Sequence, residues 1–291
     1  MMNAVVEDAS PKGGAKPGLV RGLLSARTCI GLSMIGAVVM MAIVGPYFAP
    51  YSPSELVSAP YEPPGPDVLL GADALGRDVL SRFLYGGQNL VWMAVAATLL
   101  GIGLGTTIGI SAAYFKGIID SLLMRFVDLN LAFPSVVFAL LFVTMLGPSK
   151  LLIVFLVGVS QAPSVARVIR GASLSVVGRD YIHWAKAVGL PTRHILFREV
   201  LPNVASPLLV ELGLRLMWSI SLLAGLSFLG YGIQPPNADW GLMVNESRNA
   251  LTIQPWAALA PICAIAVLSV GGNLFAEGMA RAIGRTEKVT Q

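Results

Sequence analysis

Residues that could do chemistry are few in this sequence. His183 and His194 are the only histidines, and the apolar runs hold no cluster of carboxylates, so the usual ligand sets of a metal site are missing. An intramembrane enzyme would need a nucleophile with a base, or a metal, and neither constellation is evident. The chain also lacks a GxxxxGKS or GxxxxGKT phosphate loop. We therefore expect no catalytic residue, no metal and no cofactor, ATP included, in this chain.

One ion pair is predicted inside an apolar run. Glu211 and Arg215 are four residues apart, so they share a helix face and are able to pair. Ionisable groups within a membrane are costly and usually face protein or water. Two interpretations stay open: a structural ion pair near the cytoplasmic end of the helix, or part of the lining of a translocation path.

The polar segment 180–203 lies between two apolar runs and predicts two short helices joined at a glycine. The first helix has an apolar face with i, i+3, i+4 and i+7 spacing, made of Tyr181, Trp184, Ala185 and Val188. Gly189 is expected to end this helix as a left-handed cap, and Pro191 to prevent its continuation. Thr192 is expected to cap the second helix, which closes at Pro202 and has an apolar stripe of Phe197, Val200 and Leu201.

The elements that must position these residues are transmembrane helices. The chain is 55% apolar and 12% charged, with a mean hydropathy of +0.72, whereas soluble domains are roughly 25% charged. We predict an all-α polytopic membrane protein with six spans. They are approximately Cys29–Ala49, Leu90–Tyr114, Leu129–Leu146, Leu151–Val168, Ala205–Gly230 and Ala257–Phe275. The short turn 147–150 should make the third and fourth spans a helical hairpin.

Charge distribution predicts the orientation. Placing the N-terminus inside puts 15 of the 20 Lys and Arg residues on the inner side, so both termini and segment 180–203 are expected in the cytoplasm. The net charge of +4 then needs no nucleic acid to explain it. Residues 1–27 are expected to be a disordered leader without a cleavable signal, and 286–291 a cytoplasmic tail. Cys29 and Cys263 are expected to be inert buried thiols.

The outer segment 50–87 is expected to be a compact loop that follows a proline-rich, extended stretch. Gly71, Gly76 and Gly86 are expected to mark turns. The charged residues Asp73, Arg77, Asp78 and Arg82 are spaced to bond one another. Structural bracing and contact with an external binding protein are the two open interpretations.

Two further groups of residues have structural interpretations. Asp120, Arg125 and Asp128, in the connection between the second and third spans, are interpreted as a solvated or salt-bridged collar. Glycines of the second span (Gly101, Gly103, Gly105 and Gly109) and of the sixth (Gly271 and Gly272) should permit close packing of helices.

Segment 180–203 resembles the EAA loop of bacterial ABC importer permeases, which docks in a groove of the ATPase subunit. Lys186-Ala187-Val188-Gly189 and residues 195–203, Ile-Leu-Phe-Arg-Glu-Val-Leu-Pro-Asn, carry the resemblance. His183-Trp184-Ala185 stands where the family usually has Glu-Ala-Ala. The resemblance implies coupling contacts with an ATPase at His183, Trp184, Ala185, Lys186, Ala187, Val188, Gly189, Phe197, Leu201 and Pro202.

A second group of motifs resembles those of the C-type permeases of dipeptide and oligopeptide importers. Residues 70–83 and Tyr85-Gly86 resemble the family's GTDxxGRDxxSRxxxG signature, which places Gly71, Asp73, Gly76, Arg77, Asp78, Ser81 and Arg82 in one extracytoplasmic motif. Further matches are residues 125–128, 132–135, 226–230, 234–236 and 240–241. The resemblance covers roughly 28–285, the six-helix domain, with 169–204 as its cytoplasmic coupling element.

The resemblance implies a type I importer permease in a bacterial inner membrane. Its implied partners are a homologous permease in a heterodimer, two ATPase subunits and an extracytoplasmic solute-binding protein, within membrane lipid. ATPase closure would move segment 180–203 as a lever together with the fourth and fifth spans, and Gly189 would set its angle. The cargo stays open between peptides, nickel complexes and other small solutes. A secondary transporter, the alternative of a different class, should show internal repeats and broken helices, and the sequence shows neither.

Overall fold

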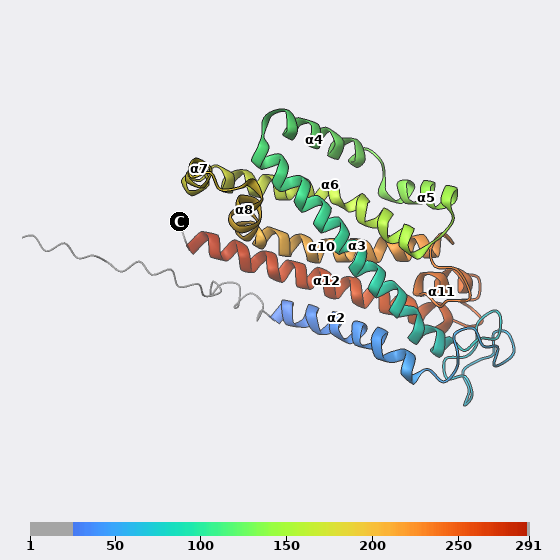
Figure 1. Ribbon diagram of the computed structural model, residues 1–291. Coiled ribbons are helices and arrows are strands. Elements are labelled where there is room, and N and C mark those ends of the chain that lie inside the picture. Colours follow the sequence, from blue (N-terminus) through green and yellow to red (C-terminus); the bar gives the residue numbers. More distant parts are fainter. Residues whose placement is uncertain (1–25, 290–291) are drawn as a thin grey trace, which may run out of the picture.

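The structure, a computed structural model, describes residues 26–289, with side chains as far as Arg281. Residues 1–25 of the predicted leader and 290–291 of the predicted tail lie outside the described residues. The described chain is helical and contains no β-strand, apart from an isolated antiparallel bridge between Ala72 and Asp78. The long helices lie side by side in an elongated bundle, with the 50–78 loop and α11 (Trp240–Ser247) at one end and α7 (Asp180–Ala187) at the other (Figure 1).

Within residues 26–289, five helices are long and apolar enough to cross a membrane, and a bent pair would make a sixth span. The five are α2 (Ala26–Val44, extended by the 3-10 turn Gly45–Phe48), α3 (Val79–Phe115), α6 (Lys150–Val177), α10 (Ala205–Phe228) and α12 (Trp256–Val289). The bent pair is α4 (Gly117–Leu131) and α5 (Ser135–Leu146). A multi-pass membrane protein is therefore confirmed, and α5 and α6 form the predicted hairpin around Gly147.

The third span differs from its prediction as one straight helix over Leu129–Leu146. Helix α4 begins much earlier, and α4 and α5 meet at 80°. The cause is Pro134, which adopts an extended conformation (ψ 126°) at the start of α5. Proline offers no N–H to the preceding turn and disfavours helical geometry at the residue before it, Phe133. The span is therefore broken next to α6 and α10.

Helix α3 is longer than its predicted span, which began at Leu90. It starts at Val79 because Asp78 caps it, accepting a hydrogen bond from the Ser81 N–H at 2.7 Å. Its 37 residues extend about 55 Å at 1.5 Å per residue, well beyond the ~30 Å of a hydrocarbon core. Residues 79–87, which were predicted to belong to the outer loop 50–87, therefore form the first turns of α3.

Helices α3 and α6 pack closely through glycines. A Cβ atom added to Gly101 would lie 2.8 Å from the Gly158 carbonyl oxygen, and one added to Gly105 would lie 2.5 Å from the Ala162 oxygen. Gly109 repeats this contact one turn later. These approaches confirm the predicted packing role. Gly103 is an exception, because it faces open space.

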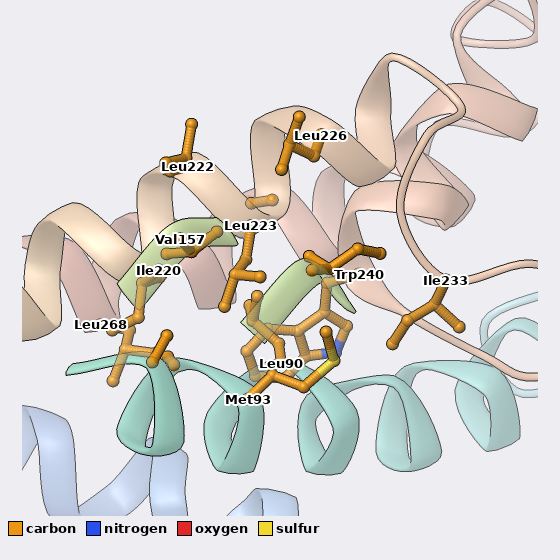
Figure 2. Close-up of a cluster of buried hydrophobic side chains, with 14 of the residues drawn as sticks. Leu90, Met93, Val157, Ile220, Leu222, Leu223, Leu226, Ile233, Trp240 and Leu268 are labelled. Atoms are coloured by element: carbon orange, nitrogen blue, oxygen red, sulfur yellow. The ribbon is translucent and has the colours of Figure 1, made fainter. Parts of the chain in front are cut away.

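The end of the bundle next to the 50–78 loop is organised around Trp240, the first residue of α11. Its indole is fully buried and donates a hydrogen bond from Nε1 to the Phe83 carbonyl oxygen at 2.8 Å. Figure 2 shows this ring beside Leu90 and Met93 of α3. A Cβ added to Gly86 would lie 2.9 Å from the indole, so this glycine makes room for tryptophan. The prediction that Gly86 marks a turn was wrong, because it lies within α3.

Cys29 and Cys263 are both exposed, so the prediction of buried thiols was wrong. Helices α2 and α12 pack through Gly31, where an added Cβ would lie 2.5 Å from the Gly271 oxygen. This small-residue seam confirms the packing role of Gly271 and leaves the cysteines on the outer surfaces of their helices. The sequence missed the distinction because an apolar span has both lipid-facing and protein-facing sides.

Candidate functional site

Helix α7 (Asp180–Ala187) ends as the sequence predicts, at Gly189 in the left-handed conformation. Its φ is +81°, and two backbone bonds close the turn: Gly189 N–H to the Lys186 oxygen at 3.0 Å, and Leu190 N–H to the Ala185 oxygen at 3.1 Å. This pair of bonds is the Schellman motif, which requires a positive φ at the glycine position. A Cβ on Gly189 would meet nothing within 4 Å, so the constraint comes from the backbone alone.

The second half of the segment is less regular than predicted. It consists of α8 (Thr192–His194), a π-helical turn η2 (Ile195–Val200) and α9 (Leu201–Asn203). Pro191, not Thr192, occupies the N-cap position, and Thr192 already lies inside the helix. The Leu201 N–H bonds the Leu196 oxygen, five residues back. Pro202 has no N–H to give to the carbonyl four residues earlier, so a regular α-helical ladder cannot continue through this point.

One face of the segment is buried against the transmembrane helices. Ile182, Ile195 and Val200 are 0% exposed and Ala185 is 4% exposed. They belong to one core cluster with residues of α3 and α6, including Ile110. Ala185 therefore holds the segment in place and cannot present its side chain to a partner, contrary to its predicted place on the docking face. Ile182, which the sequence analysis missed, anchors this face.

The opposite face presents apolar side chains without a partner in the described chain. Trp184 and Phe197 are each 67% exposed and Val188 is 59% exposed. They come from both sides of Gly189. His183, Ala187 and Pro202 are also exposed, whereas Leu201 is half-buried. We call Trp184, Val188 and Phe197 the exposed triad.

The segment is attached to three long helices. It follows α6 and precedes α10 in the chain, as the sequence requires. In addition, the Lys186 ammonium lies 4.1 Å from the ring centroid of Tyr114, at the end of α3. The predicted lever therefore continues into α3 as well as into α6 and α10.

At the other end of the bundle, two arginines and two carboxylates form a buried ion cluster. Asp73 accepts from Arg77 Nε and Arg82 Nη1, each at 2.7 Å. Glu246, on α11, lies 3.0 Å from Arg77 Nη2 and 2.8 Å from Arg82 Nη2. The latter contact is an ion pair without hydrogen-bond alignment, because Arg82 Nη2 has no hydrogen-bond acceptor. Two positive and two negative charges offset one another in this cluster.

The cluster confirms part of the predicted pairing in the outer motif. Asp78 does not pair with an arginine, because its carboxylate caps α3. Gly71 and Gly76 adopt positive φ angles (+74° and +81°) at the predicted turns. Glu246 was not predicted from the sequence, because it lies far along the chain from the 50–78 loop and no short-range pattern links the two. Burial raises the pKa of Glu246, while Arg77 acts in the opposite direction.

A second buried carboxylate caps α11. Asp239 Oδ1 accepts a hydrogen bond from the Leu242 N–H at 3.1 Å, and the residue is 1% exposed. Burial raises the pKa of Asp239 to about 6, although hydrogen bonds from Leu242, Ser227 and Gly241 and the charge of Lys150 act in the opposite direction. The buried site therefore favours the protonated carboxyl of Asp239 more than water does.

The predicted inner collar is made of different partners. Asp120 accepts two hydrogen bonds from Arg170, each at 2.6 Å, and Asp128 accepts one from Arg167 at 2.6 Å. Arg125 makes neither of these bonds. The acidic residues lie on helix α4 and not in a connecting loop, and both pairs join α4 to α6.

A cleft of about 320 Å³ opens where α4 and α5 meet α6 and α10. Arg215 lines it, and its Nε donates to Glu211 Oε2 at 2.9 Å, so the predicted pair forms. Gln161 lines it from α6, with Nε2 donating to Ser219 Oγ at 2.8 Å. Thr98 Oγ1 lies 2.8 Å from the same hydroxyl. Gln161 and Ser219 were not singled out by the sequence analysis, because polar residues in isolation give no spacing signal.

With these sites described, comparison with known proteins identifies the family. Residues 105–285 match the family described as binding-protein-dependent transport system inner membrane component. The chain belongs to this family. It is 33% identical over 261 residues to the dipeptide transport system permease protein DppC of Haemophilus influenzae, covering 87% of this chain and 88% of that protein. It is 37% identical over 214 residues to the glutathione transport system permease protein GsiD of Pectobacterium atrosepticum, with 74% and 71% covered.

Two further comparisons agree with this family membership. A putative peptide transport system permease protein of Brucella suis is 35% identical over 251 residues, covering 86% of this chain and 84% of that protein. Among solved structures, an inward-facing conformation of the MetNI methionine ABC transporter has a TM-score of 0.53 at 13% identity. It covers 68% of this chain and 96% of that one. The fold is therefore that of an ABC importer permease.

Proposed function

We propose that this chain is one permease subunit of an ATP-driven importer of peptides and forms half of its translocation pore. The observation that carries the proposal is the exposed triad, held on a rigid platform by a buried opposite face. Soluble surfaces rarely expose clustered apolar side chains, so an exposed apolar patch outside the membrane spans indicates a site of interaction with another protein. Relatives named for dipeptide, glutathione and peptide transport support the class of cargo.

The proposed machine needs several partners. A homologous permease completes the pore as a heterodimer, two ATPase subunits receive segment 180–203, and a solute-binding protein delivers cargo outside. ATP is bound and hydrolysed by the ATPase subunits, while this chain has no catalytic residue or cofactor. Both termini lie in the cytoplasm, which the excess of Lys and Arg on that side supports. No nucleic acid takes part.

Motion enters at the exposed triad. Trp184 and Val188 precede Gly189 and Phe197 follows it, so a groove that holds all three holds both halves of the segment. Closure of the ATPase pair then carries the segment as one body, because its other face is packed into the core shared with α3 and α6. The Lys186 contact with Tyr114 and the direct connection to α10 pass this movement to the helices around the cleft. Access to the cleft changes as a result.

Cysteine cross-linking tests the docking. Ala187 is exposed on α7 and Ala185 is buried two residues earlier. In a background with Cys29→Ser and Cys263→Ser, we expect Ala187→Cys to cross-link to a cysteine in the ATPase groove, and Ala185→Cys to remain uncross-linked. A cross-link at neither position, in an assembled complex that hydrolyses ATP, would contradict the proposed docking face.

A further inference from the structure

The cleft beside the broken span has a chemical character that the permease role does not by itself require. Its walls come from the α4–α5 break, from α6 and from α10. Broken helices within a membrane are tolerated where their free backbone groups face protein or a water-filled cavity. In this family member the break lies directly on a cavity.

The lining of the cleft carries positive charge without a carboxylate. Among the described residues that line it, Arg215 is the charged one, and the Glu211 that pairs with it lies outside the lining. Its partner Glu211 engages Nε, and no side chain or carbonyl among the described residues accepts a hydrogen bond from the two terminal nitrogens of the guanidinium. Helix α5 adds to this positive charge, because its 12 residues begin at the cleft with no side chain capping them. An uncapped helix N-terminus carries free N–H groups and a partial positive charge.

A second observation points independently to a ligand. Gln161 is 1% exposed, and its Nε2 donates to Ser219 and to the Val157 oxygen, while its Oε1 has no hydrogen-bond partner. A buried acceptor without a donor is costly and rare in native structures. Because Gln161 lines the cleft, a turn of its side-chain amide toward the cleft would bring this oxygen to an N–H group of a bound molecule. The cleft thus offers donors for an anion and one acceptor for an amide.

The remaining walls are apolar. Phe138 of α5 and Trp218 of α10 line the cleft together with Phe133 of the break. A volume of about 320 Å³ is at the lower end of the range for small-molecule sites, roughly 300–1,000 Å³. It suits the last residue or two of a peptide, with an apolar side chain against the aromatic walls.

We propose that this cleft is a subsite for the C-terminal carboxylate of the cargo peptide. Arg215 and the N–H groups at the start of α5 hold the carboxylate, and Gln161 Oε1 accepts from the last peptide N–H. The inference rests on the proposed peptide importer and specifies which end of the peptide this subunit holds. An amidated peptide would keep the amide contact and lose the charge-assisted bonds.

The test measures equilibrium binding of trialanine and of trialanine amide to the assembled importer in nanodiscs, without the binding protein. We expect the wild type to bind trialanine about tenfold or more tightly than the amide, since bonds to charged groups are the stronger class. Ser164 lines the cleft without a role in the proposed contacts. Ser164→Asp adds a competing carboxylate to the lining that contains Arg215 and should abolish the preference, whereas the neutral, similarly sized Ser164→Asn should retain it.

A second variant keeps the test decisive if Ser164→Asp does not assemble. Glu211→Gln with Arg215→Gln removes the ion pair without leaving one buried charge alone, and should also abolish the preference for the free acid. Equal binding of acid and amide by the wild type, no binding of either, or an unchanged preference in both variants would overturn the carboxylate subsite. ATP-dependent peptide uptake alongside such a result would leave the proposed importer intact, whereas absence of uptake would contradict the importer itself.

Discussion

Replacement of Gly189 gives the sharpest test of how the segment couples to the ATPase. Its φ of +81° lies in the region that side chains other than glycine reach at a cost of about 1–2 kcal/mol. Valine is branched at Cβ, so its cost should be at least about 2 kcal/mol. A cost of that size lowers the population of the native turn roughly 30-fold. Asparagine tolerates this region better. Because an added Cβ meets nothing within 4 Å, the two variants differ in backbone preference and not in fit to the rest of this chain.

The assay is ATP-dependent uptake of a peptide by the complete importer in proteoliposomes, with assembly measured by co-purification of the ATPase. We expect Gly189→Val to lower uptake about tenfold or more, and Gly189→Asn to retain uptake within about twofold. The Val variant should still insert and fold, since Ile182 and Ile195 keep the buried face in place. Equal uptake by both variants would refute the role of the left-handed turn. Equal loss in both would show that the space beside Gly189, occupied by the partner, decides the effect.

Three further predictions concern stability, measured by denaturation of the purified protein in detergent. Gly105→Leu, which forces a side chain against α6, should cost about 1–3 kcal/mol, whereas Gly103→Leu should be close to neutral. Glu246→Gln removes one of the two negative charges that offset Arg77 and Arg82, and should lower the free energy of unfolding by about 3 kcal/mol. The matched change Glu277→Gln, on the exposed surface, should lower it by about 0.5 kcal/mol or less. The folded pKa of Asp239, about 6, exceeds its ordinary value, so its contribution to stability is present below about pH 4 and is lost as the pH rises through 6. Asp239→Asn retains the cap and should gain stability relative to the wild type between pH 4 and 7.5, by about 2–3 kcal/mol, and a constant difference would contradict this.

Short-range patterns in the sequence predicted much of the site. The spacing of Glu211 and Arg215 gave the ion pair, because residues four apart on a helix always share a face. Gly189 beside Pro191 gave the left-handed turn, because helix termination is decided within a few residues. Long apolar runs gave the spans, because the cost of exposing backbone groups to hydrocarbon leaves the helix as the available form.

The predictions were wrong where contacts with a distant part of the chain decide the surroundings of a residue. Gly86 looked like a turn in isolation, but the indole of Trp240 takes its space within α3. Ala185 shared a helical face with Trp184 by spacing, yet packing on α3 and α6 rotated it inward. The exposure of Cys29 and Cys263 likewise depends on which side of each span the neighbouring helix covers.

The sequence alone therefore determined that this protein is a helical membrane protein and where its polar segment turns, because hydropathy and backbone preference act over a few residues. Tertiary structure decided which face of segment 180–203 is free, that Glu246 completes the buried ion cluster, and that the broken span opens a cleft at Arg215. These features arise from contacts between residues far apart in the chain, and neither composition nor periodicity records such contacts.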